Sequence, residues 1–231
     1  MLEIKSLNQF YGQSHTLWDI SLSVKKGECL CVMGRNGVGK TTLMDTIMGQ
    51  HKIASGEIIF NGENITNTPI EDRSRIGIGY VPQGRQIFPL LSVEENLRIG
   101  LNARSDGLRS IPKFIYDLFP VLFDMRRRQG GDLSGGQQQQ LAIGRALVVD
   151  PKLIIFDEPT EGIQPNIVAE IADIMRRLND EIGLTILLVE QKLPFARKMG
   201  DRFFIIDRGQ GMAEGKMTDL NEDLIKKYLT V

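Results

Sequence analysis

The sequence predicts an α/β fold in which a mostly helical segment separates two portions of a parallel sheet. Residues 29–33 and the strand 153–158, up to its acidic end, are apolar on both faces, which is typical of strands covered by helices. Residues 93–128 between them instead carry apolar side chains at helical spacing. A chain of 231 residues fits one domain of this kind with an inserted subdomain.

Antiparallel strands are predicted ahead of the parallel sheet. From residue 2 to residue 24, polar and apolar side chains alternate in short runs that are broken at Gly12. Residues 56–60 predict a further strand, and the dipeptide Asn61-Gly62 behind it favours a hairpin turn. These segments predict an antiparallel β subdomain.

The remaining elements follow from apolar periodicity and from the prolines that interrupt it. Pro112 and Pro120 divide the helical segment into shorter helices, and Asp150-Pro151 ends the helix that follows. The tail from residue 201 predicts two short strands before a final helix. The expected strands are 76–82 and 184–189, and the expected helices are one that directly follows residues 133–137 and runs to 149, and those at 166–180 and 219–228.

Residues 34–42 join the strand 29–33 to a helix and match the pattern G-x-x-x-x-G-K-[ST]. The glycines allow consecutive backbone N–H groups to approach a β-phosphate, and the helix dipole adds positive potential there. Lys40 would reach the β- and γ-phosphates, and the Thr41 hydroxyl would take one Mg²⁺ position. A glycine-rich turn with an exposed lysine is the alternative. The strand and helix around the loop favour a P-loop NTPase (RecA-like) core, with nucleotide ligands at Gly34, Asn36, Gly37, Gly39, Lys40, Thr41 and Thr42.

Carboxylates stand at the end of the predicted strand 153–158. Ligands of parallel sheets bind outside the carboxyl ends of the strands, which puts Asp157 and Glu158 beside the phosphate loop. Glu190-Gln191, after the strand 184–189, should reach the same edge. The alternative is a merely polar strand end.

The composition excludes some classes of partner. The net charge of −1, from 28 basic and 29 acidic residues, provides no general attraction to nucleic acid. No apolar run approaches the roughly 18 residues of a membrane span, and the first residues lack a signal-peptide pattern, so we expect a cytosolic chain. Cys29 and Cys31 share a strand face, but without further ligands nearby they are interpreted as small buried hydrophobes.

The motif Leu133-Ser134-Gly135-Gly136-Gln137, directly before a predicted helix, decides the class. With it the chain resembles the ATP-binding cassette (ABC) family over essentially its full length. The phosphate loop, Gln83, residues 133–137 and the pair Asp157-Glu158 fall in the family's order and approximate spacing. The resemblance implies a single ATPase domain over residues 1–231, with a nucleotide-binding core at about 1–83 and 150–231 and a helical subdomain at about 84–149.

By this resemblance, two such domains face head to tail. Each ATP is then held between the phosphate loop of one domain and Ser134, Gly135, Gly136 and Gln137 of the other. The sequence agrees, because a helix N-terminus at these residues forms a second anion site that its own subunit does not use. One chain therefore cannot complete its own active site.

The resemblance also implies roles for single residues, with ATP and Mg²⁺ as cofactors. Asp157 would hold Mg²⁺ through water, and Glu158 would be the general base for the attacking water. Gln83 would contact Mg²⁺ or this water and would sense the membrane partner. Tyr11 would stack on adenine, although a tyrosine in an edge strand could equally be packing.

Two positions depart from the family pattern. Members usually carry a histidine after the strand that follows the Asp-Glu pair, but this chain has Gln191 there, which donates a hydrogen bond but carries no charge. Gln164 likewise replaces an aspartate that bridges two subunits. Both changes could slow hydrolysis or make the chain one half of an asymmetric pair. Because Glu158 is retained, we expect activity, with Gln191 beside it in the catalytic site.

Residues 81–97, 160–165 and 189–191 resemble the ATPases of branched-chain amino acid importers, and Gln83 with Gln137-Gln138-Gln139-Gln140 is most similar to the second ATP-binding subunit of urea importers. The resemblance implies uptake of a branched-chain amino acid or of urea or a short amide. It also implies a peripheral place on the cytoplasmic face of the inner membrane. The implied partners are a second ATPase subunit, two transmembrane permease subunits and, indirectly, a solute-binding protein, with a pair of identical chains as the alternative. Part of the cluster Ile87, Phe88, Leu90 and Leu91 is expected to be an exposed apolar patch for a permease helix.

Other functions remain as alternatives. A soluble ABC ATPase of DNA repair or translation would need a long coiled coil or two cassettes, and this sequence has neither. A P-loop kinase would explain residues 34–42 but not residues 133–137. A nucleotide-gated module with little hydrolysis is favoured only by Gln164 and Gln191.

Overall fold

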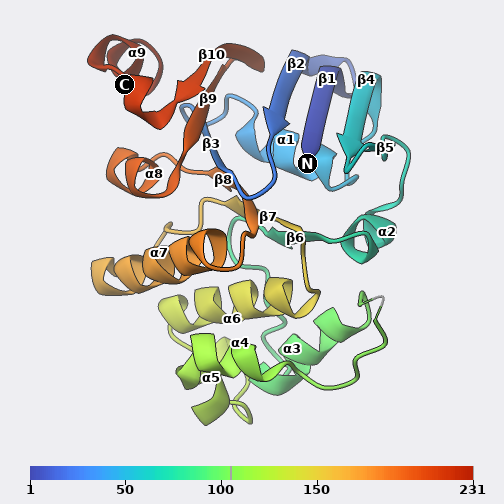
Figure 1. Cartoon of the computed structure of the whole chain (residues 1–231), viewed down its shortest axis with the longest axis vertical. Coiled ribbons are helices and arrows are strands. Elements are labelled where there is room, and N and C mark those ends of the chain that lie inside the picture. Colours follow the sequence, from blue (N-terminus) through green and yellow to red (C-terminus); the bar gives the residue numbers. More distant parts are fainter. Residues whose placement is uncertain (105, 231) are drawn as a thin grey trace.

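The computed structural model describes residues 1–104 and 106–230. Two sheets organise these residues, a four-stranded sheet in the order β2-β1-β4-β5 and a six-stranded sheet in the order β10-β9-β3-β8-β7-β6. In Figure 1 the smaller sheet lies at the top, the larger sheet runs through the middle, and α3–α6 lie at the bottom. The α/β fold predicted from the sequence is confirmed.

The four-stranded sheet is antiparallel, as its alternating pattern predicts. The Asn61-Gly62 turn has positive φ at both residues, 52° and 86°, which is the backbone that a tight hairpin requires. Strand β1 pairs with β2 on one side and β4 on the other. The assignment of Tyr11 to an edge strand was therefore wrong. The strands are β1 (Leu2–Tyr11), β2 (Ser14–Val24), β4 (Ile53–Phe60) and β5 (Glu63–Asn64).

The six-stranded sheet is parallel from β6 to β9, and only β10 runs antiparallel to its neighbour β9. Every residue of β3, β7 and β8 is buried, which explains their continuous apolar runs. The strands are β3 (Cys29–Met33), β6 (Ile78–Val81), β7 (Leu153–Asp157), β8 (Thr185–Val189), β9 (Arg202–Asp207) and β10 (Gln210–Lys216).

Alternate residues of β3 belong to two separate cores. Cys29, Cys31 and Met33 pack with the residues of α6, α7 and α8, whereas Leu30 and Val32 pack with α1 and the antiparallel sheet. Both cysteines are fully buried free thiols, and burial raises the pKa of each thiol. The helices of these layers are α1 (Lys40–Ile47), α7 (Pro165–Asp180), α8 (Leu193–Met199) and α9 (Glu222–Tyr228).

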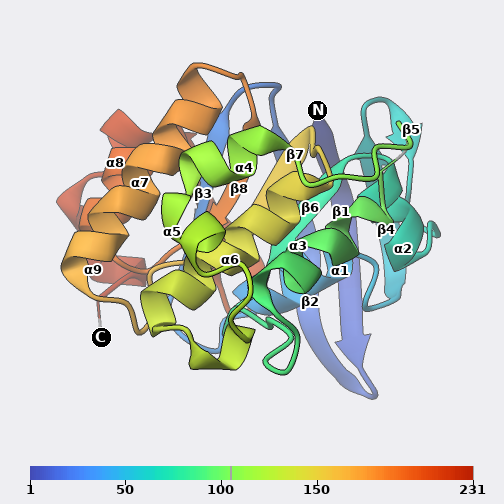
Figure 2. The ribbon, with the colours of Figure 1, turned by 90° about the horizontal axis from the view of Figure 1, so that it is seen from below.

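Between β6 and β7 the chain is mainly helical, and Figure 2 shows these helices grouped in front of the sheet. Pro112 is the residue before α4 and Pro120 is the first residue of α5, so both prolines begin helices. Capping boxes at Ser92 and Ser134 fix the starts of α3 and α6. The helices are α3 (Val93–Leu101), α4 (Lys113–Leu118), α5 (Pro120–Asp124) and α6 (Gly135–Val148), with a 3₁₀ turn at Gly130–Asp132.

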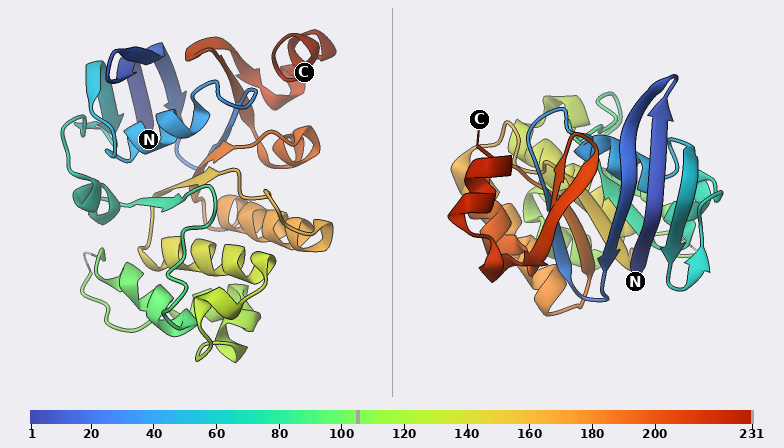
Figure 3. Two further views of the ribbon diagram at one scale, coloured as in Figure 1. Left: turned by 180° about the vertical axis from the view of Figure 1, so that it is seen from behind. Right: turned by 90° about the horizontal axis from the view of Figure 1, so that it is seen from above.

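Two short helices were not predicted. Helix α2 (Ile70–Arg75) and helix α8 are too short to display an apolar period, so the pattern did not indicate them. A 3₁₀ turn at Met217–Asp219 leads to α9, which lies on the far side of the molecule from the N-terminal strand in Figure 3. No helix within residues 1–104 and 106–230 is long and apolar enough to cross a bilayer.

Arg73 of α2 joins this helix to the end of α1. Its guanidinium group, which is almost fully buried, donates hydrogen bonds to the backbone carbonyls of Thr46, Ile47, Thr66 and Thr68. Burial lowers the pKa of this group. Among the described residues, the carbonyls of Ile47, Thr66 and Thr68 thus depend on this one side chain for a donor, whereas the Thr46 carbonyl also accepts from the Gly49 backbone N–H.

We expect Arg73→Met to lower the free energy of unfolding by about 3 kcal/mol, because it leaves the carbonyls of Ile47, Thr66 and Thr68 without a donor. Chemical denaturation measures the change. Arg75→Met is the matched control, since Arg75 is exposed and pairs with Asp72 at the surface, and it should cost below ~1 kcal/mol. Equal losses in both variants would contradict the prediction.

Candidate functional site

The loop between β3 and α1 has the geometry that its glycines predict. Gly37 and Gly39 adopt left-handed φ angles of 77° and 106°. A Cβ atom on Gly39 would lie 3.0 Å from Cδ2 of Leu17 and close to the backbone of Thr16. The loop therefore closes tightly against β2, and a side chain at this position would be both strained and crowded.

Lys40 lies inside this loop. Its Nζ donates hydrogen bonds to the carbonyl oxygens of Gly34 and Arg35, at 2.9 Å and 2.8 Å, and lies 3.5 Å from Oε1 of Glu158. Burial lowers the pKa of Lys40, and the charge of Glu158 opposes that shift. With only 4% of its side chain exposed, Lys40 holds a positive charge at the bottom of the loop.

A cavity of about 320 Å³ opens over this loop. It unites the ends of three parallel strands, because the phosphate loop follows β3, Gln83 follows β6 and Glu158 follows β7. Thr16 of β2 also lines it, which the sequence did not indicate. The lining residues are Thr16, Asn36, Gly37, Gly39, Lys40, Thr41, Thr42, Gln83 and Glu158.

Asp157 is the last residue of β7 and is buried. Neither carboxylate oxygen has a hydrogen-bond donor among the described residues. Burial raises the pKa of Asp157 to about 6, helped by the charges of Glu158 and Asp45, while the nearby Thr41 hydroxyl and Lys40 oppose the shift. Two unpartnered carboxylate oxygens beside a threonine hydroxyl are a donor set that fits a hard divalent cation such as Mg²⁺.

Glu158 has a left-handed φ of 49°, which costs on the order of 1–3 kcal/mol in a residue other than glycine. Its backbone N–H donates to the Val189 carbonyl at the end of β8. The Gln191 side-chain amide donates a hydrogen bond to Oε1 of Glu158. The two residues thus come together at the sheet edge where the sequence places both.

Gln83 and Arg85 connect this site to the helical segment. The Gln83 amide donates to Oε2 of Glu161 at 3.0 Å, and the Arg85 guanidinium donates to Oε1 of Gln138 at 3.2 Å and to the carbonyl of Gly162 at 3.4 Å. The sequence did not indicate Arg85. A left-handed φ of 69° at a residue other than glycine marks it in the structure.

Several predicted residues lie outside the cavity. Ser134 and Gln137 cap α6, with the Ser134 hydroxyl accepting from the Gln137 backbone and the Gln137 side chain accepting from the Ser134 backbone. Gln164 precedes α7 and is exposed. Tyr11 is half-exposed at the end of β1, where its hydroxyl shares a hydrogen bond with His51.

Gly135 and Gly136, at the start of the same helix, are closely approached by other side chains. A Cβ atom on Gly135 would lie 3.1 Å from the Arg85 guanidinium nitrogens, and one on Gly136 would lie 2.9 Å from Cγ2 of Ile167. Both contacts come from outside the helix. The Arg85 guanidinium can move aside, whereas a larger residue at Gly136 would require Ile167 of α7 to shift.

A comparison with known protein families identifies this arrangement. The family described as ABC transporter matches residues 17–161, which span the phosphate loop, Gln83, the capped start of α6 and Asp157-Glu158. The chain belongs to the ABC transporter family. As a member, it is an ATPase that hydrolyses ATP to ADP and phosphate with Mg²⁺ as cofactor.

The ABC chain is similar to curated proteins along most of its length. It is 40% identical over 212 residues to the high-affinity branched-chain amino acid transport ATP-binding protein BraG of Pseudomonas aeruginosa, covering 91% of this chain and 90% of BraG. It is 36% identical over 223 residues to the probable branched-chain amino acid transport ATP-binding protein LivF of Archaeoglobus fulgidus, covering 96% of this chain and 94% of LivF.

Solved structures of ABC cassettes have the same fold. A dimeric ATP-binding cassette in a post-hydrolysis state, bound to ADP and Pi, superposes with a TM-score of 0.83 at 27% identity, covering 94% of this chain and 99% of that one. A nucleotide-free cassette from an ABC transporter gives a TM-score of 0.83 at 31% identity, covering 99% and 94%.

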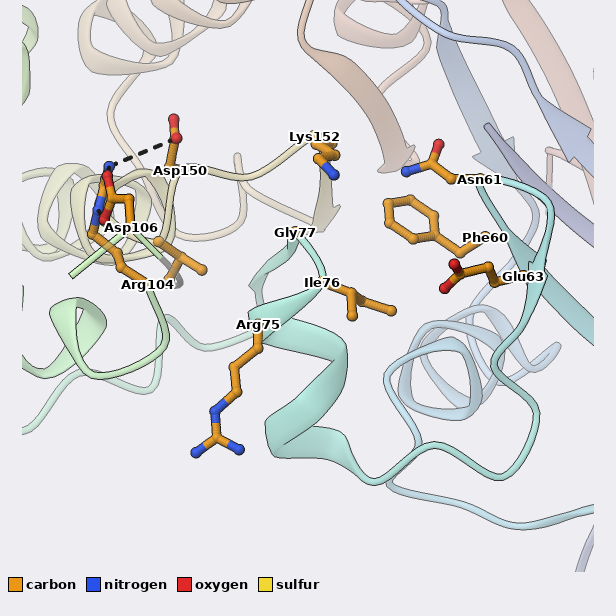
Figure 4. Close-up of a pocket in the computed structure, with 11 residues that line it drawn as sticks. Phe60, Asn61, Glu63, Arg75, Ile76, Gly77, Arg104, Asp106, Asp150 and Lys152 are labelled. Carbon is orange, nitrogen blue, oxygen red and sulfur yellow. Dashed lines mark hydrogen bonds and ion pairs between the residues drawn. The ribbon is translucent and has the colours of Figure 1, made fainter. Parts of the chain in front are cut away.

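The ABC ATPase has a second cavity, of about 290 Å³, at the opposite edge of the parallel sheet. Gly77 and Lys152, which precede β6 and β7, line it together with Phe60, and Figure 4 shows these residues arriving from separate segments. Arg104 beside it pairs with Asp150 at 3.7 Å. This cavity lies at the amino ends of the strands, so it is separate from the nucleotide site.

We expect Asp157→Asn to stabilise the ABC ATPase in the absence of nucleotide and Mg²⁺. The pKa of Asp157 rises from 3.8 to about 6 on folding, so the ionised carboxylate is disfavoured in the folded protein. Because the folded protein holds the proton of Asp157 more tightly, this group contributes fully to the free energy of unfolding below about pH 4. The contribution is lost as the pH rises through about 6. At pH 8 the variant should therefore gain about 1–3 kcal/mol in free energy of unfolding.

Denaturation in a chelating buffer at pH 8 and at pH 4 measures this gain, which should disappear at the lower pH. The same variant should lose ATP hydrolysis, since the neutral amide is a poorer Mg²⁺ ligand. A variant less stable than the wild type at pH 8 would contradict the assigned cause of the pKa shift.

Proposed function

We propose that this chain is the ATP-hydrolysing subunit of an ABC importer for a small polar solute. The observation that carries the proposal is the cavity in which Lys40, Thr41, Gln83 and Glu158 meet, with the unpartnered carboxylate of Asp157 behind it. The similarity to BraG and LivF, which are branched-chain amino acid transport proteins, supports a branched-chain amino acid as the solute. Urea or a short amide is the second candidate, which rests on the resemblance of Gln83 and of the run Gln137-Gln138-Gln139-Gln140.

Glu158 is the general base of the proposed reaction. Its carboxylate borders the cavity, where it accepts a proton from the attacking water. The Gln191 amide donates to Oε1 of Glu158 and so orients the carboxylate, but unlike a histidine it cannot take up the proton. Gln191 therefore acts through position alone.

The phosphate groups are bound by the loop and by Lys40, whose buried ammonium balances negative charge. The nucleotide contacts proposed in this loop are those of Gly34, Asn36, Gly37, Gly39, Lys40, Thr41 and Thr42. Thr41, Gln83 and Asp157 would hold Mg²⁺, which neutralises charge on the phosphates. Tyr11, at the hairpin next to this loop, offers its ring to the adenine base.

A second cassette completes the proposed site. The N-terminus of α6, with Ser134 to Gln137, does not line the cavity of its own chain, so it is free to bind the nucleotide of a partner. The similarity to a solved dimer supports this pairing. Gln164 and Gln191 favour a different ATPase subunit as the partner, and a pair of identical chains is the alternative.

The permease would contact the segment after Gln83. Phe88 is 45% exposed and Leu90 is 80% exposed, while Ile87 and Leu91 are half-buried. The Arg145 guanidinium of α6 lies 5.3 Å from the Phe88 ring centroid and donates to the Gln86 carbonyl. This patch is thereby tied to the helix that presents Ser134 to the second ATP.

We propose that residues 1–231 act as one ATPase domain. Its core spans about 1–83 and 150–231, and a helical subdomain at about 84–149 passes nucleotide-driven motion to two permease subunits. The assembly would lie on the cytoplasmic face of the inner membrane and receive solute through a solute-binding protein.

Glu158→Gln should lower ATP turnover on the order of 10²–10⁴-fold while leaving ATP affinity unchanged, because the amide cannot accept the proton. Steady-state hydrolysis and nucleotide binding measure the two effects, and an ATP-trapped dimer should appear by light scattering. Glu161→Gln is the control, since Glu161 bonds Gln83 but does not line the cavity. Normal turnover in Glu158→Gln would refute the assigned base and would leave hydrolysis to another group.

Phe88→Ala should spare the ATPase activity of the isolated chain but weaken its association with permease subunits, because it removes exposed apolar area from the patch. Co-purification with the permease measures the association. Phe123→Ala is a matched control, because Phe123 of α5 is exposed to a similar extent but lies outside the patch. If the wild type, Phe88→Ala and Phe123→Ala all capture the permease equally well, the result would count against the proposed docking surface.

A further inference from the structure

The two histidines of the chain both lie near the β1–β2 hairpin, but they make different contacts. Nε2 of His51 shares a hydrogen bond of 2.7 Å with the Tyr11 hydroxyl, and the two rings meet edge to face with centroids 4.8 Å apart. His15 instead stacks between Phe10 and Trp18, at 4.0 Å and 3.5 Å. Only His51 therefore contacts the proposed adenine-binding side chain.

His51 also lies close to the helix of the phosphate loop. Its Nε2 lies 3.7 Å from Oδ2 of Asp45, and Oδ1 of Asp45 accepts a hydrogen bond of 3.0 Å from the Tyr80 hydroxyl on β6. Asp45 belongs to α1, whose first residue is Lys40. A chain of polar contacts thus runs from Tyr11 through His51 and Asp45 to a strand of the central sheet.

These contacts connect the Tyr11 ring to the helix that begins at the phosphate loop. The β1–β2 hairpin also borders the phosphate cavity, since Thr16 lines it and Gly39 packs against Leu17. Tyr11 is 47% exposed and stands at the end of its strand. Without the bond to His51, such a ring could adopt several rotamers, and ordering it on binding would reduce affinity.

We propose that His51 is a positioning residue for ATP binding: its hydrogen bond holds the Tyr11 ring, ahead of binding, in the orientation that receives adenine. This inference rests on the proposed nucleotide role of Tyr11 and adds a residue to that site. His51 need not touch the nucleotide, because it acts through Tyr11. Its loss should weaken recognition of the base and leave the phosphate contacts and the hydrolytic step intact.

The experiment compares His51→Ala, His51→Gln, Tyr11→Phe and Tyr11→Ala in the full chain. We expect His51→Ala and Tyr11→Phe each to raise the Kd and the KM for ATP about three- to tenfold, with kcat changed less than about twofold. His51→Gln, which keeps a hydrogen-bonding group, should recover part of the affinity. The double variant His51→Ala/Tyr11→Phe should bind ATP no more weakly than either single variant, because both substitutions remove the same hydrogen bond.

Two controls separate positioning from general damage. His15→Ala removes the other histidine of the hairpin, which bonds Asn8 at 3.0 Å, and should leave the Kd for ATP unchanged. Inorganic tripolyphosphate, which has no base, should bind the wild type and His51→Ala equally. Weaker tripolyphosphate binding in His51→Ala, or a lower kcat at unchanged KM, would overturn the proposal in favour of a structural role.

The outcomes also separate this inference from the proposed site. If Tyr11→Ala weakens ATP binding while His51→Ala and Tyr11→Phe do not, Tyr11 binds the base but His51 does not position it, which overturns the inference alone. If Tyr11→Ala binds ATP as the wild type does, the nucleotide role of Tyr11 fails, and the role of His51 fails with it.

Discussion

The buried positive charge of Lys40 is the constraint on which the site depends. Its ammonium group is almost fully enclosed, so the carbonyls of Gly34 and Arg35 must face it and the carboxylate of Glu158 must lie nearby. These contacts hold the loop in the open curve that leaves room for phosphates, and they tie the end of β3 to the end of β7. A bound phosphate would add negative charge beside the Lys40 ammonium, which the Glu158 carboxylate already partly balances.

Asp157 shows the opposite situation next to it. Its oxygens are buried without a donor among the described residues, and burial raises its pKa, so the folded protein carries an unfavourable group where a cation is needed. Glu158 adds backbone strain at the following position. Stability is therefore reduced where the chemistry occurs, while the fully buried strands β3, β7 and β8 supply the compensating apolar burial.

Long side chains connect the nucleotide site to distant surfaces. Arg85 joins the segment after Gln83 to α6 and to the loop before α7, and Arg145 joins α6 back to Gln86 and Phe88. Movement of Gln83 during the ATP cycle would therefore displace both the exposed apolar patch and the start of α6 at Ser134. This gives a physical route by which nucleotide state and permease contact can influence each other.

The sequence by itself determined the phosphate loop, the fully buried strands, the capped start of α6 and the family. Each of these is indicated by a pattern of residues that lie close together along the chain. Only the tertiary structure decided which distant side chains meet. Tyr11 and His51 are 40 positions apart, and Arg85 and Gln138 are 53 apart. Such pairs depend on strand order and helix packing, which local periodicity does not encode.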